Sequence, residues 1–277
     1  MNRIELINQI QQKKNYLCVG LDTNITKIPA HLQSHPNAVF EFNKAIIDAT
    51  KDLCVSYKLN TAFYEAMGIK GWEALEQTVN YIPATHFKIA DAKRGDIGNT
   101  STQYAKTFFD VYNFDAITVA PYMGEDSVRP FLEYENKWTI VLGLTSNKGS
   151  KDFQQLITKA GGVSESFLYE TVMNKIVSWG TPDNLMFVVG ATKPEQLQGI
   201  RQKFPDHFFL VPGVGFQGGS LEEVSKAALT KVGGVLVNAS RAIIYAGHDE
   251  NFAEEAAVIA AQYAEEMKEY LGNHIGT

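Results

Sequence analysis

The sequence from residue 85 to 97 carries the strongest structural signal of the chain. It runs Thr85-His86-Phe87-Lys88-Ile89-Ala90-Asp91-Ala92-Lys93-Arg94-Gly95-Asp96-Ile97. The first six residues are typical of a buried strand, and the charged residues follow where that strand opens into a loop. If strand geometry continues through Lys93, the two-residue period places Asp91 and Lys93 on one face, with Asp96 in the loop beyond. Such a cluster is costly unless its charges pair or take part in chemistry, so it is the first candidate site.

Seven other short apolar runs resemble the one that precedes Asp91. Each is rich in β-branched or aromatic residues and largely lacks internal alternation, which is typical of parallel strands covered on both faces. The eight runs are 16–21, 54–59, 86–90, 116–120, 139–144, 185–189, 208–211 and 235–237.

Helical patterns occupy the connections between these runs. In the segment 100–112, Tyr104, Phe108, Val111 and Tyr112 form one apolar stripe, and Thr100 or Ser101 is suited to cap its start. The longest connection, 146–184, is expected to hold a loop over 147–152 and 160–164 and then a helix from about Glu165 to Trp179. Further helices are expected over 37–51, 194–204 and 251–271.

Eight strand–helix units in roughly 250 residues match a (β/α)8 TIM barrel of the α/β class. A doubly wound open sheet is the alternative, but no G-x-G-x-x-G fingerprint opens a helix after the first strand. No linker, internal repeat or low-complexity segment divides the sequence. We therefore expect residues 1–277 to form a single barrel domain.

Composition narrows the functional classes. The chain has 277 residues, 45% of them hydrophobic, and a formal charge of -6, which argues against a general nucleic-acid surface. No apolar stretch approaches a membrane span, and the N-terminal residues do not resemble a signal peptide. Cys18 and Cys54 lie in apolar runs and are expected to be buried free thiols of a cytoplasmic protein rather than a disulfide. Neither cysteine has metal-site spacing, so no metal is expected.

Polar residues at the ends of the strands indicate where the chemistry lies, because TIM-barrel sites form at the carboxyl ends of the strands. Asp22 ends the first run, Lys58 the second, and Asp91 and Lys93 the third. A single aspartate in such a place is usually a turn or cap residue, and a single lysine is usually a solvated charge. Two charges of each sign at three consecutive strand ends favour a functional cluster.

The last two strands supply a candidate phosphate site. Gly213, Gly215, Gly218 and Gly219 allow backbone N–H groups to approach a ligand closely, and Arg241 offers forked donors. Loops after strands seven and eight are the usual phosphate site of this barrel. The sequence therefore predicts a phosphorylated substrate that spans the barrel mouth.

At these residues the chain resembles the orotidine 5'-phosphate decarboxylase family, and its longer bacterial branch in particular. The resemblance spans the whole barrel in the family's chain order. It rests on Leu21-Asp22, Tyr57-Lys58-Leu59-Asn60, the Asp-x-Lys-x-x-Asp motif at 91–96 with Ile97-Gly98-Asn99-Thr100, Thr145-Ser146-Asn147, Pro212-Gly213-Val214-Gly215 with Gln217, and Ser240-Arg241.

The resemblance implies cofactor-free conversion of orotidine 5'-monophosphate to uridine 5'-monophosphate in pyrimidine synthesis. Lys93 is then expected to protonate carbon 6, and Asp91 to sit against the substrate carboxylate. A homodimer with shared active sites is implied, in which Asp96, Ile97 and Thr100 reach the neighbouring site. Other implied contacts are Asp22 and Lys58 to the ribose, with Lys58 also in the charge network, Ser146 to the base, Gln217 to base and phosphate, and Gly215 and Arg241 to the phosphate.

Two other readings remain open at this stage. A sister enzyme with the same motif acts on a sugar phosphate through a magnesium-bound enediolate and is expected to carry an acidic ligand after the second strand. Lys58 stands there instead, although Glu65 follows nearby. A barrel that binds nucleotides without catalysis is the other reading, but binding alone does not require Asp91, Lys93 and Asp96 together.

Overall fold

Eight parallel strands close into a barrel in this computed structural model, which describes residues 1–159, 165–191, 193–215 and 219–275. Around the barrel the strands follow the order β1-β2-β3-β4-β5-β8-β9-β10, and β10 pairs with β1. The TIM-barrel prediction is thus confirmed, and every predicted run contributes one strand. The strands are β1 Leu17–Gly20, β2 Ser56–Asn60, β3 Phe87–Arg94, β4 Ala116–Val119, β5 Trp138–Leu144, β8 Leu185–Val189, β9 Phe208–Pro212 and β10 Val235–Ala239.

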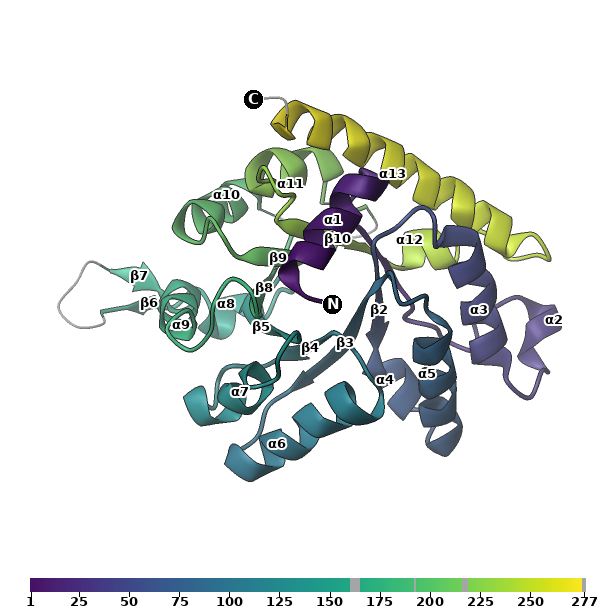
Figure 1. The fold of residues 1–277 in the computed structure, drawn as a ribbon, viewed down its shortest axis with the longest axis horizontal. Coiled ribbons are helices and arrows are strands. Elements are labelled where there is room, and N and C mark those ends of the chain that lie inside the picture. Colours follow the sequence, from purple (N-terminus) through teal and green to yellow (C-terminus); the bar gives the residue numbers. More distant parts are fainter. Residues whose placement is uncertain (160–164, 192, 216–218, 276–277) are drawn as a thin grey trace.

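Helices surround the barrel in Figure 1, and α1 lies across one of its ends. The predicted helices over 37–51, 194–204 and 251–271 appear as α3, α10 and α13. The helices are α1 Arg3–Lys13, α2 Ala30–Gln33, α3 Ala38–Thr50, α4 Thr61–Glu65, α5 Ile69–Tyr81, α6 Gly98–Lys106, α7 Glu125–Leu132, α8 Ser150–Phe153, α9 Leu168–Ile176, α10 Pro194–Lys203, α11 Leu221–Ala228, α12 Arg241–Ile244 and α13 Phe252–Ile275.

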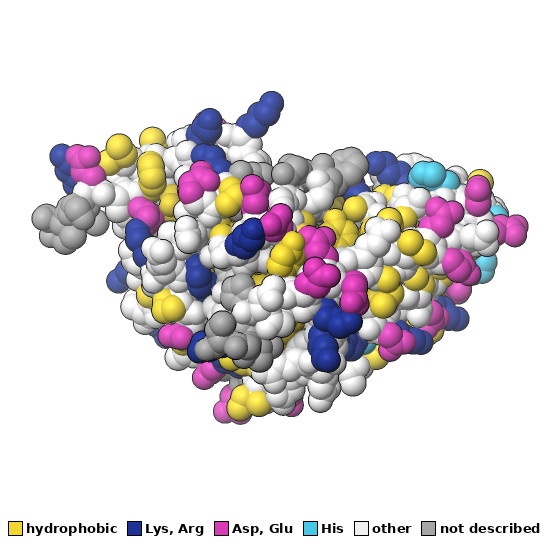
Figure 2. Space-filling model, turned by 90° about the horizontal axis from the view of Figure 1, so that it is seen from above, with side chains coloured by type: hydrophobic (Ala, Val, Ile, Leu, Met, Phe, Trp, Pro, Cys, Tyr) yellow, Lys and Arg dark blue, Asp and Glu magenta, His cyan; other side chains and the backbone are white. Residues whose placement is uncertain are grey.

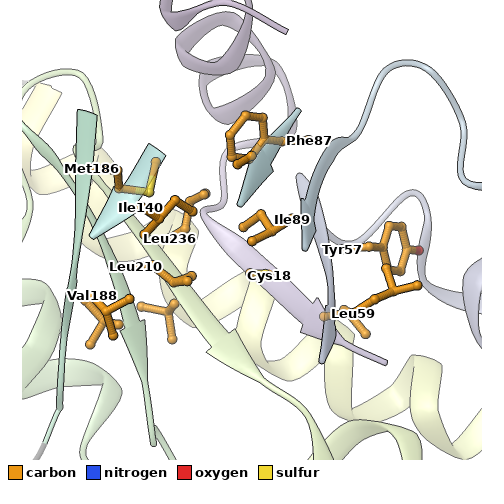
Figure 3. Packing of buried hydrophobic residues seen from close by; sticks show 14 of the residues in the cluster. Cys18, Tyr57, Leu59, Phe87, Ile89, Ile140, Met186, Val188, Leu210 and Leu236 are labelled. Atoms are coloured by element: carbon orange, nitrogen blue, oxygen red, sulfur yellow. The ribbon is translucent and has the colours of Figure 1, made fainter. Parts of the chain in front are cut away.

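Apolar side chains fill the barrel below its mouth. Figure 3 shows Ile89, Ile140, Leu210 and Leu236 converging on the interior from four different strands, while Tyr57 points outward from β2. The Tyr57 hydroxyl lies 2.8 Å from that of Thr50 on α3, which satisfies it in the layer between strand and helix. Burial on both faces explains why the strand sequences are continuously apolar.

The helix predicted over 100–112 differs from its expectation in two respects. It begins at Gly98, with Ile97 as the N-cap, so neither Thr100 nor Ser101 caps it. Its last turn, η1 (Thr107–Val111), is a π-helix. A π turn contains an extra residue, which rotates the apolar stripe and leaves Val111 61% exposed.

The long connection contains more structure than the sequence predicts. Gln154 to Thr158 lead from α8 into a two-stranded antiparallel hairpin, β6 (Ile157–Thr158) with β7 (Ser166–Phe167). The helix expected from about Glu165 starts only at Leu168, because the two preceding residues pair in the hairpin. The loop expected over 147–152 is wrong in part, because Ser150–Phe153 form the short helix α8. The loop expected over 160–164 lies outside the described residues.

The prediction that both cysteines are buried free thiols is confirmed. Cys18 and Cys54 are free and buried, and burial raises the pKa of both thiols to about 12. Among the described residues, no helix has both the length and the apolar character of a membrane span. Acidic and basic side chains are interspersed with hydrophobic ones over the face shown in Figure 2.

Candidate functional site

A buried lysine joins the first three strands at the barrel mouth. Lys58, on β2, places its Nζ 3.0 Å from Oδ1 of Asp22, which follows β1. The same Nζ lies 3.1 Å from Oδ2 of Asp91 on β3. Parallel strands end at one edge of the barrel, which is why residues 36 and 33 positions apart in the sequence meet here.

Burial and charge act in opposite directions on Lys58, which is only 3% exposed. Burial is the largest single influence and lowers its pKa, but the carboxylates of Asp22 and Asp91 together outweigh it and raise the pKa above the ordinary value. Lys58 is therefore a fixed positive charge within the barrel mouth.

Asp91 binds a second lysine on its other oxygen. Nζ of Lys93 lies 2.5 Å from Oδ1 of Asp91, and the Lys93 side chain is 49% exposed. Burial is again the largest single influence and raises the pKa of Asp91, but Lys58 and Lys93 together hold that pKa well below its usual range. A carboxylate between two ammonium groups thus links the buried charge to an accessible one.

An irregularity in β3 aims Lys93 into this cluster. The pairing of β3 with β4 shifts register between Ala90 and Arg94. Within that interval Lys93 has φ of 47°, in the left-handed region that side chains other than glycine rarely adopt. The Lys93 N–H donates to the hydroxyl of Thr118 on β4 at 2.9 Å, and that hydroxyl donates to Oδ1 of Asp91 at 3.0 Å.

A pocket of about 140 Å³ opens beside the charged cluster. It extends from the carboxylates to the ends of β9 and β10, where Arg241 stands at the start of α12. Ser240 donates to the carbonyl of Gly20 at 2.9 Å and so ties β10 to β1 beside it. The lining residues are Asp22, Lys58, Asp91, Pro212, Gly213, Val214, Asn238, Ser240, Arg241 and Ala242.

The sequence predicts no role for two residues of this region, Thr118 beside the charged cluster and Asn238 in the pocket lining. Thr118 is wholly buried in an apolar run, and its polarity was the only available signal. Asn238 is 7% exposed, and its Oδ1 is buried without a hydrogen-bond partner. The sequence places Asn238 at the end of the last strand, but it does not show that the side chain faces the pocket.

The other predicted binding residues lie around this pocket rather than in it. Gly215 has φ of 80° and donates its N–H to the carbonyl of Gly219 at 2.9 Å. Ser146 follows β5 and lies against the end of β8, where a side chain on Gly190 would collide with it. Gln217 lies outside the described residues.

The second half of the motif lies between the end of β3 and the first turn of α6. Asp96 is half-buried, and its Oδ1 accepts the N–H of Ile97 at 2.7 Å. Ile97 is 64% exposed and Thr100 is also exposed. Among the ion pairs of the described residues, none joins Asp96 to Lys58 or Lys93. The structure therefore brings together Asp22, Lys58, Asp91 and Lys93, and leaves this trio on the surface nearby.

Glu65 is the acidic residue considered above as a metal ligand after the second strand, and its carboxylate pairs with an arginine instead. Its carboxylate forms an ion pair with Arg94, whose guanidinium also lies over the ring of Tyr104. In the part of the chain that the structure describes, no three His, Cys, Asp or Glu side chains are grouped so that they could hold a metal ion.

The comparisons with known proteins agree with this arrangement. The model described as "Orotidine 5'-phosphate decarboxylase / HUMPS family" matches residues 15–256. The orotidine 5'-phosphate decarboxylase of Bacteroides fragilis is 55% identical over 98% of this chain and 98% of its own length, and that of Flavobacterium johnsoniae is 56% identical over the same shares. The solved structure of Leishmania donovani OMP decarboxylase is 36% identical, has a TM-score of 0.83, and covers 98% of this chain and 100% of its own. The chain belongs to the orotidine 5'-phosphate decarboxylase / HUMPS family.

Proposed function

We propose that the protein decarboxylates orotidine 5'-monophosphate to uridine 5'-monophosphate, the step that its relatives' names describe, and that the whole barrel of residues 1–277 acts in the cytoplasm as the catalytic domain. The observation that carries the proposal is the position of Lys93, whose ammonium rests on Asp91 beside a pocket that ends at Arg241. This geometry suits a substrate with a reacting carboxylate at one end and a phosphate at the other.

The reaction breaks the bond between carbon 6 and the carboxylate, and the electron pair stays on carbon 6. Carbon dioxide leaves, and the Lys93 ammonium transfers a proton to carbon 6. The barrier must fall by an amount on the order of 20 kcal/mol, near the upper end of ordinary enzyme catalysis. A preorganised ammonium supplies charge stabilisation where the carbanion develops, without reorganisation of solvent.

Asp91 orients Lys93 for this transfer while Lys58 supports Asp91 from the buried side. The substrate carboxylate meets Asp91 in this proposal, and Lys58 with Asp22 binds the ribose hydroxyls. Because Lys58 is almost fully enclosed, its charge is screened little by water and holds both aspartates in place.

The phosphate is assigned to the ends of β9 and β10. Arg241 supplies a forked cation, and Gly213 and Gly215, with φ of 94° and 80°, allow a ligand to approach the backbone closely. Ser146 is proposed to contact the base, and Gln217 to bridge base and phosphate. Binding energy from these remote contacts accelerates the reaction where it is realised in the transition state rather than in the ground state.

A homodimer with shared active sites is also part of the proposal. Asp96, Ile97 and Thr100 would complete the neighbouring subunit's site. The support is that large apolar side chains are exposed after β3 and β4, Ile97 by 64%, Tyr122 by 89% and Met123 by 49%. Large apolar side chains exposed beside a catalytic loop are suited to a protein interface.

The test is to add purified protein to orotidine 5'-monophosphate, without added metal, and to follow the fall in ultraviolet absorbance of the orotate ring. A steady fall with release of carbon dioxide is expected. Tight binding of uridine 5'-monophosphate with no turnover would favour the non-catalytic barrel. Activity on a sugar phosphate that a chelator abolishes would favour the magnesium-dependent sister enzyme.

A further inference from the structure

The hydroxyl of Thr118 occupies a position that the proposed function does not yet use. Thr118 lies in β4, is wholly buried, and forms two hydrogen bonds, both to residues of the Asp91–Lys93 segment. We propose that Thr118 is a positioning residue, which sets the direction of the Lys93 side chain by bridging the Lys93 backbone and the Asp91 carboxylate. The inference rests on the proposed function, because it assigns to Thr118 the orientation of the proton donor.

The need for such a bridge follows from the irregular pairing of β3 and β4. Ala90 pairs with Ile117 and Arg94 pairs with Val119, so residues 91–93 of β3 lie opposite Thr118 alone. Extra residues in one strand interrupt the ladder and leave backbone groups without their usual partners. The Lys93 N–H is such a group, and the Thr118 hydroxyl accepts it at 2.9 Å.

The same hydroxyl also determines where the side chain of Lys93 ends. It donates its proton to Oδ1 of Asp91 at 3.0 Å, the oxygen on which the Lys93 ammonium rests at 2.5 Å. Lys93 is therefore held at both ends by one group, directly at its backbone and through Asp91 at its Nζ. Since φ of Lys93 is 47°, the backbone requires such support to remain in this conformation.

Two substitutions separate the hydroxyl from the shape of the side chain. Thr118→Val keeps the branched shape and removes both hydrogen bonds, whereas Thr118→Ser keeps the hydroxyl. The matched control is Thr139→Val in β5, since Thr139 is equally buried but its hydroxyl has no hydrogen-bond partner.

Steady-state kinetics with orotidine 5'-monophosphate provide the first measurement. Thr118→Val is expected to lower kcat by about 10- to 100-fold, the loss for one hydrogen bond to a charged group. KM should change by less than about threefold, because Thr118 does not line the substrate pocket. Thr118→Ser should recover kcat to within a few-fold of wild type, and Thr139→Val should match wild type.

Three kinetic results would overturn the proposal: an unchanged kcat in Thr118→Val, an equal loss in Thr118→Ser, or a rise in KM that accounts for the loss. A crystal structure of Thr118→Val supplies a readout that does not depend on turnover. It should show Lys93 with a negative φ and its Nζ withdrawn from Asp91, and unaltered Lys93 geometry would refute the inference. Absence of turnover in the wild-type protein would instead refute the proposed function, and the crystal structure would still decide the role of Thr118.

Discussion

Replacement of Lys58 by methionine would test the buried charge network most severely. Methionine retains an unbranched side chain of similar size but leaves Asp22 and Asp91 without the ammonium that lies 3.0 and 3.1 Å away. The side chains of the two aspartates are only 19% and 12% exposed, so water cannot fully replace the lost partner. Removal of one member of a buried ion pair typically costs about 3–5 kcal/mol, and we expect Lys58→Met to destabilise the protein by that amount near neutral pH.

The cost should depend on pH in a defined direction. In the wild-type protein the folded-state pKa of Asp91 is lowered, so its contribution to stability is present above the unfolded-state value of about 4 and is lost as pH falls through the folded pKa. Without Lys58, only Lys93 of the two ammonium groups still lowers the folded-state pKa of Asp91, so that pKa should rise toward the unfolded-state value. The variant then loses less stability than the wild-type protein as pH falls below about 4, and the difference in unfolding free energy between the two proteins should narrow from about pH 7 to pH 3.

Urea unfolding followed by far-ultraviolet circular dichroism at the two pH values measures both effects. Lys51→Met is the matched control, because Lys51 forms an exposed ion pair with Asp48 and its side chain is 41% exposed. The control should change the free energy of unfolding by no more than about 0.5 kcal/mol. A loss below about 1 kcal/mol in Lys58→Met, or a loss that does not vary with pH, would refute the argument that Lys58 is a structurally essential buried charge.

Three other predictions follow from the site. Arg241→Ala should weaken uridine 5'-monophosphate binding by about 10- to 100-fold but leave the weak binding of uridine unchanged, as measured by calorimetry; equal losses for both ligands would contradict the phosphate role. Gly215→Ala should weaken binding of the same nucleotide, because φ of 80° is strained for alanine and the new methyl group would collide with the Tyr263 hydroxyl. An unchanged affinity would show that Gly215 is not part of the site. A mixture of Lys93→Ala and Asp96→Ala proteins should recover part of the activity that each lacks, and no recovery despite subunit exchange would argue against shared active sites.

The fold and the charged cluster were predictable because each depends on a short-range pattern. Eight apolar runs with helical connections specify the barrel, and a barrel brings its strand ends together. The meeting of Asp22, Lys58 and Asp91 follows from those two facts, although the residues are far apart in the sequence. The surface position of Ile97 was not predictable from the residues themselves and came from the family resemblance.

The features that the sequence did not reveal depend on local departures from regular geometry. Thr118 can form its two hydrogen bonds because the pairing of β3 and β4 shifts register. No pattern in the sequence predicts that shift. The π turn that exposes Val111 is likewise an extra residue in a helix that otherwise has ordinary spacing. The sequence does not predict helix α1, because only Leu6 and Ile10 are buried along it and two residues make a weak apolar stripe.

The most direct test of the central claim compares Lys93→Ala with the wild-type protein in two measurements on the same preparation. One is the rate of carbon dioxide release from orotidine 5'-monophosphate, and the other is the affinity for uridine 5'-monophosphate. If the Lys93 ammonium donates the proton to carbon 6, the variant should bind the product to within about tenfold of wild type while its turnover falls by at least about four orders of magnitude. Turnover that survives the substitution within about tenfold would contradict the assignment of Lys93 as the proton donor.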